Sequence, residues 1–304
     1  MGRKKTPSLA YQIRSAVNNN FREGTSKRAA KMSENGTGST VYSYGHRKNL
    51  IEFGTQFANY CKSEFNIKQL KDINQTHIDS FLKHKATTCA DTTLKTYYQH
   101  ISKLNKCVNA SFSSCKADWT KGVMIPAGAN NTKQRDAKMS RESMDKVLGV
   151  LDPSIASHRG IFIAEALGTR VEETVTIKGS DIDLNKGTVH VIGKGGRPRE
   201  IPIPEERIEA FKGFREDFGD SRIVDIDKDS VNEEFRELRK ELDIHDLDGT
   251  RSGIHAIRKL YATEHFEELV SQGMDEKQAW DATSDLIGHG ENRNDLFKDY
   301  VIRD

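Results

Sequence analysis

The second half of this 304-residue chain contains side chains that are suited to chemistry on a phosphodiester. Breaking such a bond without a metal needs cations around the non-bridging oxygens, a nucleophile, and a donor that protonates the departing alkoxide. Arginine suits the first task because its guanidinium is always charged and binds bidentately. Tyrosine, lysine and histidine can perform the other two tasks. The candidate residues are Arg170, Lys194, His255, Arg258, His289 and Tyr300.

Each candidate also has a plain structural interpretation when it is taken alone. Arg170 could cap a helix, His255 could be a satisfied core histidine, and Lys194 could lie in a solvated turn. The prediction of a catalytic site therefore depends on the ordered set and its local contexts. These contexts are Leu167-Gly-Thr-Arg170 with Glu173 three residues later, Gly193-Lys194-Gly195, His255-Ala-Ile-Arg258, Leu286-Ile-Gly-His289, and Tyr300 near the C-terminus.

This ordered set resembles the tyrosine recombinase family, the phage-type integrases. The resemblance implies that Arg170 and Arg258 clamp the scissile phosphate and that Glu173 orients Arg170. It also implies that Tyr300 attacks to form a 3′-phosphotyrosine. Because that covalent link conserves the energy of the phosphodiester, the strand can be resealed without ATP or a metal, and no cofactor is expected.

The resemblance gives the remaining roles to one lysine and two histidines. Lys194, at the tip of a mobile hairpin, is implied to be the general acid for the leaving 5′ oxygen. His255 is implied to be an acid/base partner, and His289 to donate a hydrogen bond to a non-bridging oxygen. Two features depart from the common family pattern. Lys259 stands where many members have histidine, and His289 lies eleven residues before Tyr300, a longer spacing than most members have.

The elements that must position these residues are mostly helical. In the second half, a period-two pattern predicts strands at 188–192 and 200–203, which form a hairpin with a basic, glycine-rich tip. In the first half, Leu50, Phe53, Phe57 and Tyr60 recur at spacings of three and four, which indicates one face of a helix. This half resembles the core-binding domain of the same family.

We therefore predict an α+β fold that is mostly α with a small β-hairpin or sheet. The expected organisation is a basic N-terminal arm or linker at 1–42, with one helix near 8–31, and a helical core-binding domain at 43–127. A glycine-, asparagine- and charge-rich linker follows at 128–138, and a catalytic domain at 139–304. By the family resemblance, the two domains form a C-shaped clamp around duplex DNA.

Charge is distributed unevenly along the chain. Residues 1–136 hold 22 Lys and Arg against 9 Asp and Glu, and the remainder holds 25 against 36. The basic half is suited to a polyanion, although a solvated basic face explains the charge equally well. The predicted DNA-binding residues are Lys95, Tyr98 and Lys103 in one helix and Arg197 and Arg199 in the hairpin. Core packing explains the tyrosines of that helix about as well.

Composition argues against several other classes of protein. No stretch is long and apolar enough to span a bilayer, and the basic start is not followed by an apolar signal core, so a cytoplasmic location is expected. The four cysteines form no C-x-x-C pair, so neither a zinc site nor a disulfide framework is predicted. We expect no metal site.

The family resemblance implies recombination sites in double-stranded DNA as substrates. It implies four protomers on two sites, strand exchange through a Holliday junction, and integration or excision of a mobile element or phage, with accessory DNA-bending proteins as possible partners. Two alternatives stay open. A type IB topoisomerase shares the chemistry but works as a monomer, and a DNA-binding accessory protein could keep the fold without cutting.

Overall fold

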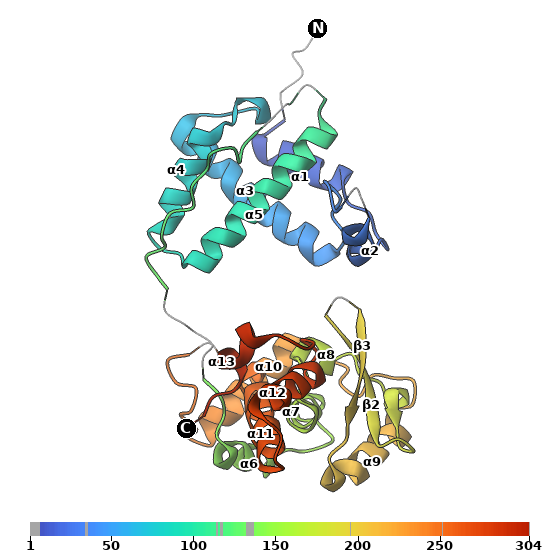
Figure 1. Ribbon diagram of the computed structural model, residues 1–304. Coiled ribbons are helices and arrows are strands. Elements are labelled where there is room, and N and C mark those ends of the chain that lie inside the picture. Colours follow the sequence, from blue (N-terminus) through green and yellow to red (C-terminus); the bar gives the residue numbers. More distant parts are fainter. Residues whose placement is uncertain are drawn as a thin grey trace. The chain divides into compact units, whose positions relative to one another are not determined.

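The chain folds into two compact units, Met1–Thr132 and Lys133–Asp304 (Figure 1). The computed structural model describes residues 7–33, 36–113, 115, 118–131, 137–194, 196–250 and 252–303, without the side chain of Arg28. Helices dominate both units, and the second also contains one small sheet. The prediction of a mostly helical fold with a small sheet is therefore confirmed.

Unit 1 is helical in all its regular elements within the described residues. Its longest helix begins after Ser43, whose side chain accepts a hydrogen bond from the His46 amide, and ends at Asn66 in the left-handed conformation. Of the predicted apolar stripe, Leu50, Phe53 and Phe57 are buried in the core of the unit, and Tyr60 is partly buried against it. The elements are α1 (Leu9–Asn19), α2 (Lys27–Met32), α3 (Tyr44–Phe65), the 3-10 turn η1 (Leu70–Asp72), α4 (Gln75–Ala86) and α5 (Asp91–Ser111).

The structure corrects the expectation of an arm over residues 1–42. The single helix expected near 8–31 is two helices, α1 and α2, and α1 packs against α3 and α5. Leu9, Ile13 and Val17 are buried in the unit 1 core because together they form an apolar stripe along α1. The Asn20 amide, just after α1, also donates to the Cys107 carbonyl of α5. Residues 1–6 of the expected arm lie outside the described residues.

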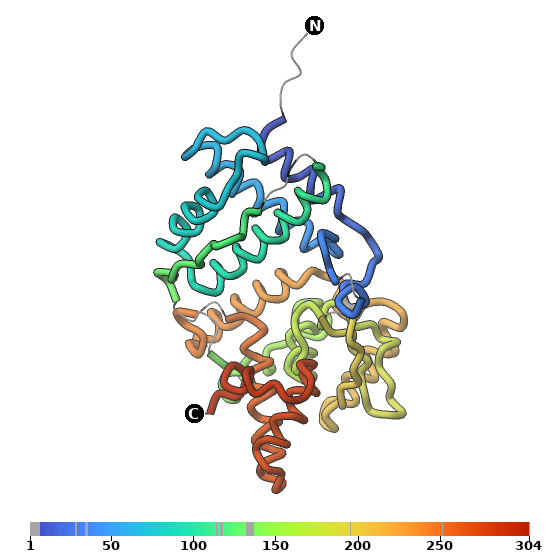
Figure 2. The backbone as a smooth tube through the Cα atoms, turned by 45° about the horizontal axis from the view of Figure 1, so that its top comes forward, coloured from blue at the N-terminus to red at the C-terminus, as the bar shows by residue number. Residues whose placement is uncertain are grey.

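Unit 2 has helices on either side of α11, the long helix that runs through it in Figures 1 and 2. One apolar core joins α7, α10, α11 and the sheet, and a smaller one joins α11, α12 and α13. The helices are α6 (Arg141–Leu148), α7 (Ala156–Leu167), α8 (Val171–Thr174), α9 (Ile208–Phe218), α10 (Lys228–Glu241), α11 (Ile254–Ser271), α12 (Glu276–Leu286) and α13 (Phe297–Tyr300). The 3-10 turns are η2 (Gly179–Asp181), η3 (Glu205–Arg207) and η4 (Asn294–Leu296).

The sheet of unit 2 is antiparallel, with the strand order β1-β2-β3. The predicted hairpin is present as β2 (Thr188–Gly193) and β3 (Arg197–Pro202). Both strands reach further toward the hairpin tip than the sequence pattern predicted. Val191 is opposite Arg199 in the ladder, and Gly193 is opposite Arg197. The sequence pattern did not predict β1 (Ile182–Asp183), because two residues are too few to show an alternation. Lys194 follows β2 directly.

No helix of the described residues is long and apolar enough to cross a membrane.

Candidate active site

A tight junction between α7 and α8 positions Arg170. Gly168 ends α7 with a φ of 58°, and a side chain there would collide with the Tyr261 ring. Arg170 then caps α8. Glu173, three residues on, accepts the Arg170 backbone N–H at 3.0 Å through Oε2 and the Arg170 Nη1 at 2.7 Å through Oε1. The predicted orienting contact between Glu173 and Arg170 is thus present in the geometry.

Glu173 is only 4% exposed, yet it is surrounded by arginines. Arg199 approaches as a fork, with Nη2 at 2.7 Å from Oε2 and Nη1 at 3.3 Å from Oε1. Burial alone raises the pKa of Glu173, but the hydrogen bonds and positive charge of Arg199 and Arg170 outweigh it and lower this pKa to about 2. The carboxylate is therefore ionised at neutral pH and holds two guanidinium groups in place.

Arg258 lies on α11 and has no exposed surface. Its Nη1 donates to the Gly168 carbonyl at 2.6 Å and its Nη2 to the Ile287 carbonyl. Its guanidinium carbon lies 5.6 Å from the centre of the Tyr300 ring. Burial, followed by the charge of Arg170, lowers the pKa of Arg258 to about 10, so the group stays cationic at neutral pH.

His289 is the point where the L-x-G-H segment meets Arg170. Arg170 Nη2 lies 3.1 Å from His289 Nε2. Burial lowers the pKa of His289, and the charges of Arg258 and Arg170 lower it further, to about 3. The imidazole is consequently neutral at neutral pH and can serve as a hydrogen-bond group beside the two arginines.

Tyr300 ends α13 and is 6% exposed. Its ring packs edge-on against His289, with centroids 4.8 Å apart, and against His255, with centroids 5.4 Å apart. The Tyr300 carbonyl accepts a hydrogen bond from Thr263 Oγ1 of α11 at 3.2 Å. The Tyr300 ring thus contacts both histidines and lies against the buried Arg258.

The structure brings together five of the six predicted catalytic residues. Lys194 is exposed in the turn after β2, and it takes no part in the described contacts that join the other five. It lies at the tip of the β2–β3 hairpin, on a different element from the other five. The five clustered residues are Arg170, His255, Arg258, His289 and Tyr300.

The predicted DNA-binding residues occupy different environments. Lys95 on α5 and Arg197 on β3 are exposed, whereas Tyr98 is partly buried against the unit 1 core. The Lys103 ammonium donates to the carbonyls of Thr40 at 2.7 Å and Gly38 at 3.0 Å, so it ties a loop to α5. The Arg199 guanidinium is bound to Glu173 and to the Leu286 carbonyl, and its side chain is only 11% exposed because α8 and the end of α12 cover it. The roles of all five residues in binding DNA stay predictions.

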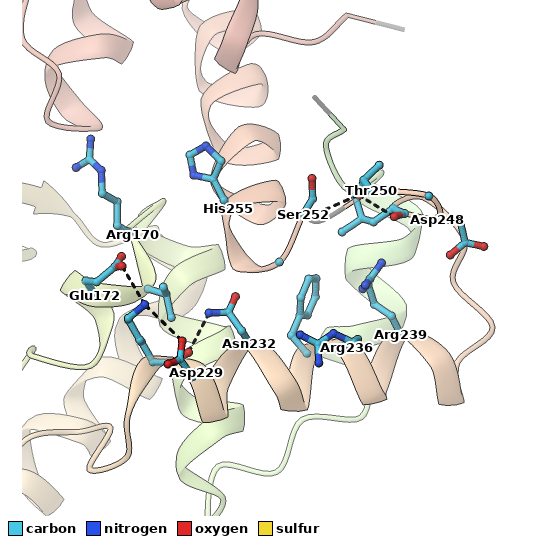
Figure 3. A pocket seen from close by; sticks show the side chains of 16 residues that line it. Arg170, Glu172, Asp229, Asn232, Arg236, Arg239, Asp248, Thr250, Ser252 and His255 are labelled. Atoms are coloured by element: carbon cyan, nitrogen blue, oxygen red, sulfur yellow. Dashed lines mark hydrogen bonds and ion pairs between the residues drawn. The ribbon is translucent and has the colours of Figure 1, made fainter. Parts of the chain in front are cut away.

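A groove of about 750 Å³ adjoins the cluster at Arg170 and His255 (Figure 3). It runs between α10 and the loop that precedes α11. Arg236 and Arg239 line it three residues apart on one face of α10, and the Arg239 Nε is buried without a hydrogen-bond partner among the described residues. Sequence reasoning missed this pair, although the spacing of three was a usable signal. Asp229 and Asp248 also line the groove, so its charge is mixed.

No group of three or more His, Cys, Asp or Glu side chains in the described part of the chain could hold a metal ion. The cationic groups of the cluster are arginines.

Known sequences and structures resemble the chain in both units. The sequence model of the phage integrase family matches residues 138–289, half of the chain. Tyrosine recombinase XerA of Thermococcus onnurineus (strain NA1) is 30% identical over 167 residues, which cover 52% of this chain and 55% of that protein. The chain spans about half the length of the curated relatives it matches.

Two solved structures share the fold. A lambda integrase dimer bound to a COC′ core site matches with a TM-score of 0.60 at 16% identity, covering 94% of this chain and 97% of that one. A lambda integrase tetramer bound to a Holliday junction also matches with a TM-score of 0.60, at 15% identity, covering 99% and 80%. At these identities the likeness establishes the fold.

Proposed function

Because this chain belongs to the phage integrase family of tyrosine recombinases, we propose that it is a site-specific DNA recombinase that cuts and rejoins strands through a 3′-phosphotyrosine at Tyr300. The observation that carries the proposal is the packing of the Tyr300 ring against His289, His255 and the guanidinium of Arg258. A nucleophile, proton-transfer groups and two cations thus share one site, as transesterification without a metal requires.

In the proposed reaction, Arg170 and Arg258 hold the non-bridging oxygens of the scissile phosphate. The Tyr300 oxygen attacks phosphorus and its proton passes to His255, while the bond to the 5′ oxygen breaks. Lys194 protonates that oxygen, which leaves as a hydroxyl. A 5′ hydroxyl from another strand then gives its proton to Lys194 and attacks the phosphotyrosine. The tyrosine leaves and regains its proton from His255, and the phosphodiester is restored without ATP or a metal.

The site must open before it reacts. Arg258 is fully buried and its terminal nitrogens are bound to carbonyls, while the Tyr300 ring packs over it. A phosphate therefore reaches Arg258 only if the segment that carries Tyr300 moves. The helix α13 has four residues and is held mainly by packing against α11 and α12, so a local displacement suffices.

The proposed substrate is a recombination site in double-stranded DNA. We propose that four protomers act on two sites and exchange strands through a Holliday junction, in integration or excision of a mobile element or phage. Support comes from the lambda integrase structures with the same fold, one bound to a core site and one to a Holliday junction. Accessory DNA-bending proteins and a cytoplasmic location with the nucleoid belong to the same proposal.

The groove beside Arg170 is the proposed path of the DNA backbone next to the scissile phosphate. Arg236 and Arg239 would neutralise neighbouring phosphates there, since arginine binds phosphate oxygens as a fork. The acidic residues of the groove would limit the strength of this contact. The exposed Lys95 and Arg197 are further proposed contacts to DNA.

A covalent-adduct assay tests the proposal. The chain is incubated with a nicked duplex that carries the recombination site and loses its short 5′ fragment on cleavage, and the products are separated under denaturing conditions. We expect a protein–DNA adduct whose peptide maps to residue 300. A DNA-binding module that keeps the fold without cutting would shift the duplex but yield no adduct. A type IB topoisomerase would relax supercoiled plasmid that lacks the site, and this outcome would exclude a site-specific recombinase.

A further inference from the structure

Arg199 joins three elements around the active site. It lies on β3, opposite Val191 of β2, and its side chain is only 11% exposed. Two of its nitrogens grip the Glu173 carboxylate of α8, and its Nε donates to the Leu286 carbonyl at the end of α12 over 3.1 Å. A single guanidinium thereby connects the hairpin to the carboxylate behind Arg170 and to the segment that leads to His289.

Two glycines make room for this guanidinium. A Cβ on Gly193 would lie 2.9 Å from the Arg199 Nη1, and one on Gly288 would lie 3.0 Å from the same atom. Gly288 also has a φ of 76°, a backbone conformation that glycine adopts at no steric cost. Any larger residue at either place would displace Arg199, so the slot accepts the guanidinium because both neighbours lack a side chain.

The position of Arg199 has a direct consequence for Lys194. From the rung that pairs Val191 with Arg199, the ladder continues through Gly193 to the turn that carries Lys194. At roughly 3.3 Å per residue, the lysine lies only about 10 Å beyond the fixed rung. Within the described residues, no other ion pair joins β2 or β3 to α8 or α12. Without Arg199, the hairpin would remain folded but would lose its charged attachment to the cluster.

We propose that Arg199 is a positioning residue that fixes the β2–β3 hairpin against the phosphate-binding cluster and so delivers Lys194 to the leaving oxygen. This inference rests on the proposed function, in which Lys194 is the general acid. Arg170 makes two hydrogen bonds of its own to Glu173, and neither involves Arg199. The loss is therefore expected in leaving-group protonation and not in the phosphate clamp.

The first test measures attachment of the hairpin without reference to catalysis. Amide hydrogen exchange of residues 188–202 is compared in wild type, Arg199→Gln and the control Arg207→Gln. Arg207 is a matched control because it also pairs with a buried glutamate of unit 2, Glu165, at 3.3 Å. We expect exchange near the hairpin tip to rise about tenfold in Arg199→Gln and to stay unchanged in the control, since both variants lose a bond to a buried glutamate but only the first loses the bonds that join the hairpin to α8 and α12.

The second test uses duplex DNA with sulfur in place of the 5′ bridging oxygen. A thiolate leaves without a proton, so this substrate removes the need for a general acid. On ordinary DNA we expect Arg199→Gln to cleave about 100-fold more slowly than wild type. A displacement of a reacting group by about 1 Å can lower the rate by this factor. On the sulfur substrate the rate should return close to that of wild type. The double variant with Lys194→Ala should be no slower than Lys194→Ala alone.

Unchanged exchange at the hairpin would overturn the inference, whatever reaction the protein performs. Raised exchange without sulfur rescue, in a protein whose Lys194→Ala variant is rescued, would also overturn it. Failure of the wild-type chain to form any adduct refutes the proposed function instead, and the exchange measurement still decides whether Arg199 anchors the hairpin.

Discussion

Arg170 Nη2 lies 3.1 Å from His289 Nε2, and this contact fixes the protonation state of the histidine. A guanidinium can only donate, so the His289 Nε2 must accept and the ring proton must reside on Nδ1. The Nε2 lone pair therefore accepts the hydrogen bond from Arg170 as long as no phosphate is bound. His289 can donate to a phosphate oxygen through Nδ1, or through Nε2 after Arg170 has turned to the phosphate and the tautomer has changed.

We predict that His289 does not titrate between pH 5 and 8. Burial and the charges of Arg258 and Arg170 hold its pKa near 3. His245 is the internal control, because hydrogen bonds from its ring to Asp248 and the nearby Asp243 raise its pKa above the usual value of 6.5. Histidine-selective NMR over this pH range should show His245 gaining a proton as pH falls while His289 stays neutral.

The same shift has a consequence for stability. Since the pKa of His289 is lower in the folded chain, the unfolded chain binds the proton first as pH falls below about 6.5. Folded stability should therefore decline between pH 6.5 and 3, and part of this decline should disappear in His289→Gln. Denaturant titrations at several pH values measure it, and an identical decline in both proteins would contradict the assignment.

Tyr300→Phe should bind DNA like wild type but form no covalent adduct. The substitution keeps the ring that packs on His289 and His255 and removes only the nucleophilic oxygen. The matched control is Tyr261→Phe. Burial raises the pKa of Tyr261 to about 12, which makes it a poor nucleophile, so this variant should still form the adduct. An adduct that persists in Tyr300→Phe and maps elsewhere would exclude Tyr300 as the nucleophile.

Lys194→Ala should be impaired by about 10²–10⁴-fold on ordinary DNA, the usual contribution of a general acid. The same variant should cleave the substrate with a 5′ bridging sulfur at close to the wild-type rate. Arg170→Ala should stay slow on both substrates, because the charge on the non-bridging oxygens still lacks its cation. If sulfur fails to rescue Lys194→Ala, Lys194 is not the general acid, and His255 and Arg258 become the candidates for that role.

Cleavage should continue in excess chelator. Within the described residues the cations around Tyr300 are arginines, and the buried Glu173 carboxylate, 4.0 Å from Arg258 Nη1, is already bound by Arg170 and Arg199. The measurement is adduct yield with and without EDTA, after prior dialysis against the chelator. Loss of the adduct, followed by its return on addition of Mg²⁺, would show that a metal takes part.

The uneven charge predicts that unit 1 dominates non-specific binding to DNA. A fragment of residues 1–136 should bind duplex DNA more tightly than 137–304. Its affinity should fall steeply with salt, with a log–log slope of roughly −0.9 for each phosphate neutralised. Fluorescence anisotropy at several salt concentrations measures both fragments. Lys103→Ala provides a control within the first fragment, because the Lys103 ammonium is bound to backbone carbonyls and should contribute little to the slope.

The sequence by itself determined the helical stripes, the hairpin and the order of the reactive residues. These features depend on local periodicity and residue type, so Leu50, Phe53 and Phe57 are found on the buried face that their spacing predicted. The roles of the cluster stay predictions, but the residues chosen from the sequence include Tyr300 and the four that cluster with it.

Only the tertiary structure decided which charged side chains are exposed and which are bound within the protein. Arg197 and Arg199 are two residues apart on one strand, so they project from the same face, and local sequence makes them equivalent. Arg199 is bound to Glu173 because α8 and the end of α12 cover its part of the strand. Arg197 lies nearer the hairpin tip and is exposed. The burial of α1 was decided in the same way. An apolar stripe shows that a helix needs a partner, but the partner helices α3 and α5 are distant in the chain, and only the fold brings them together.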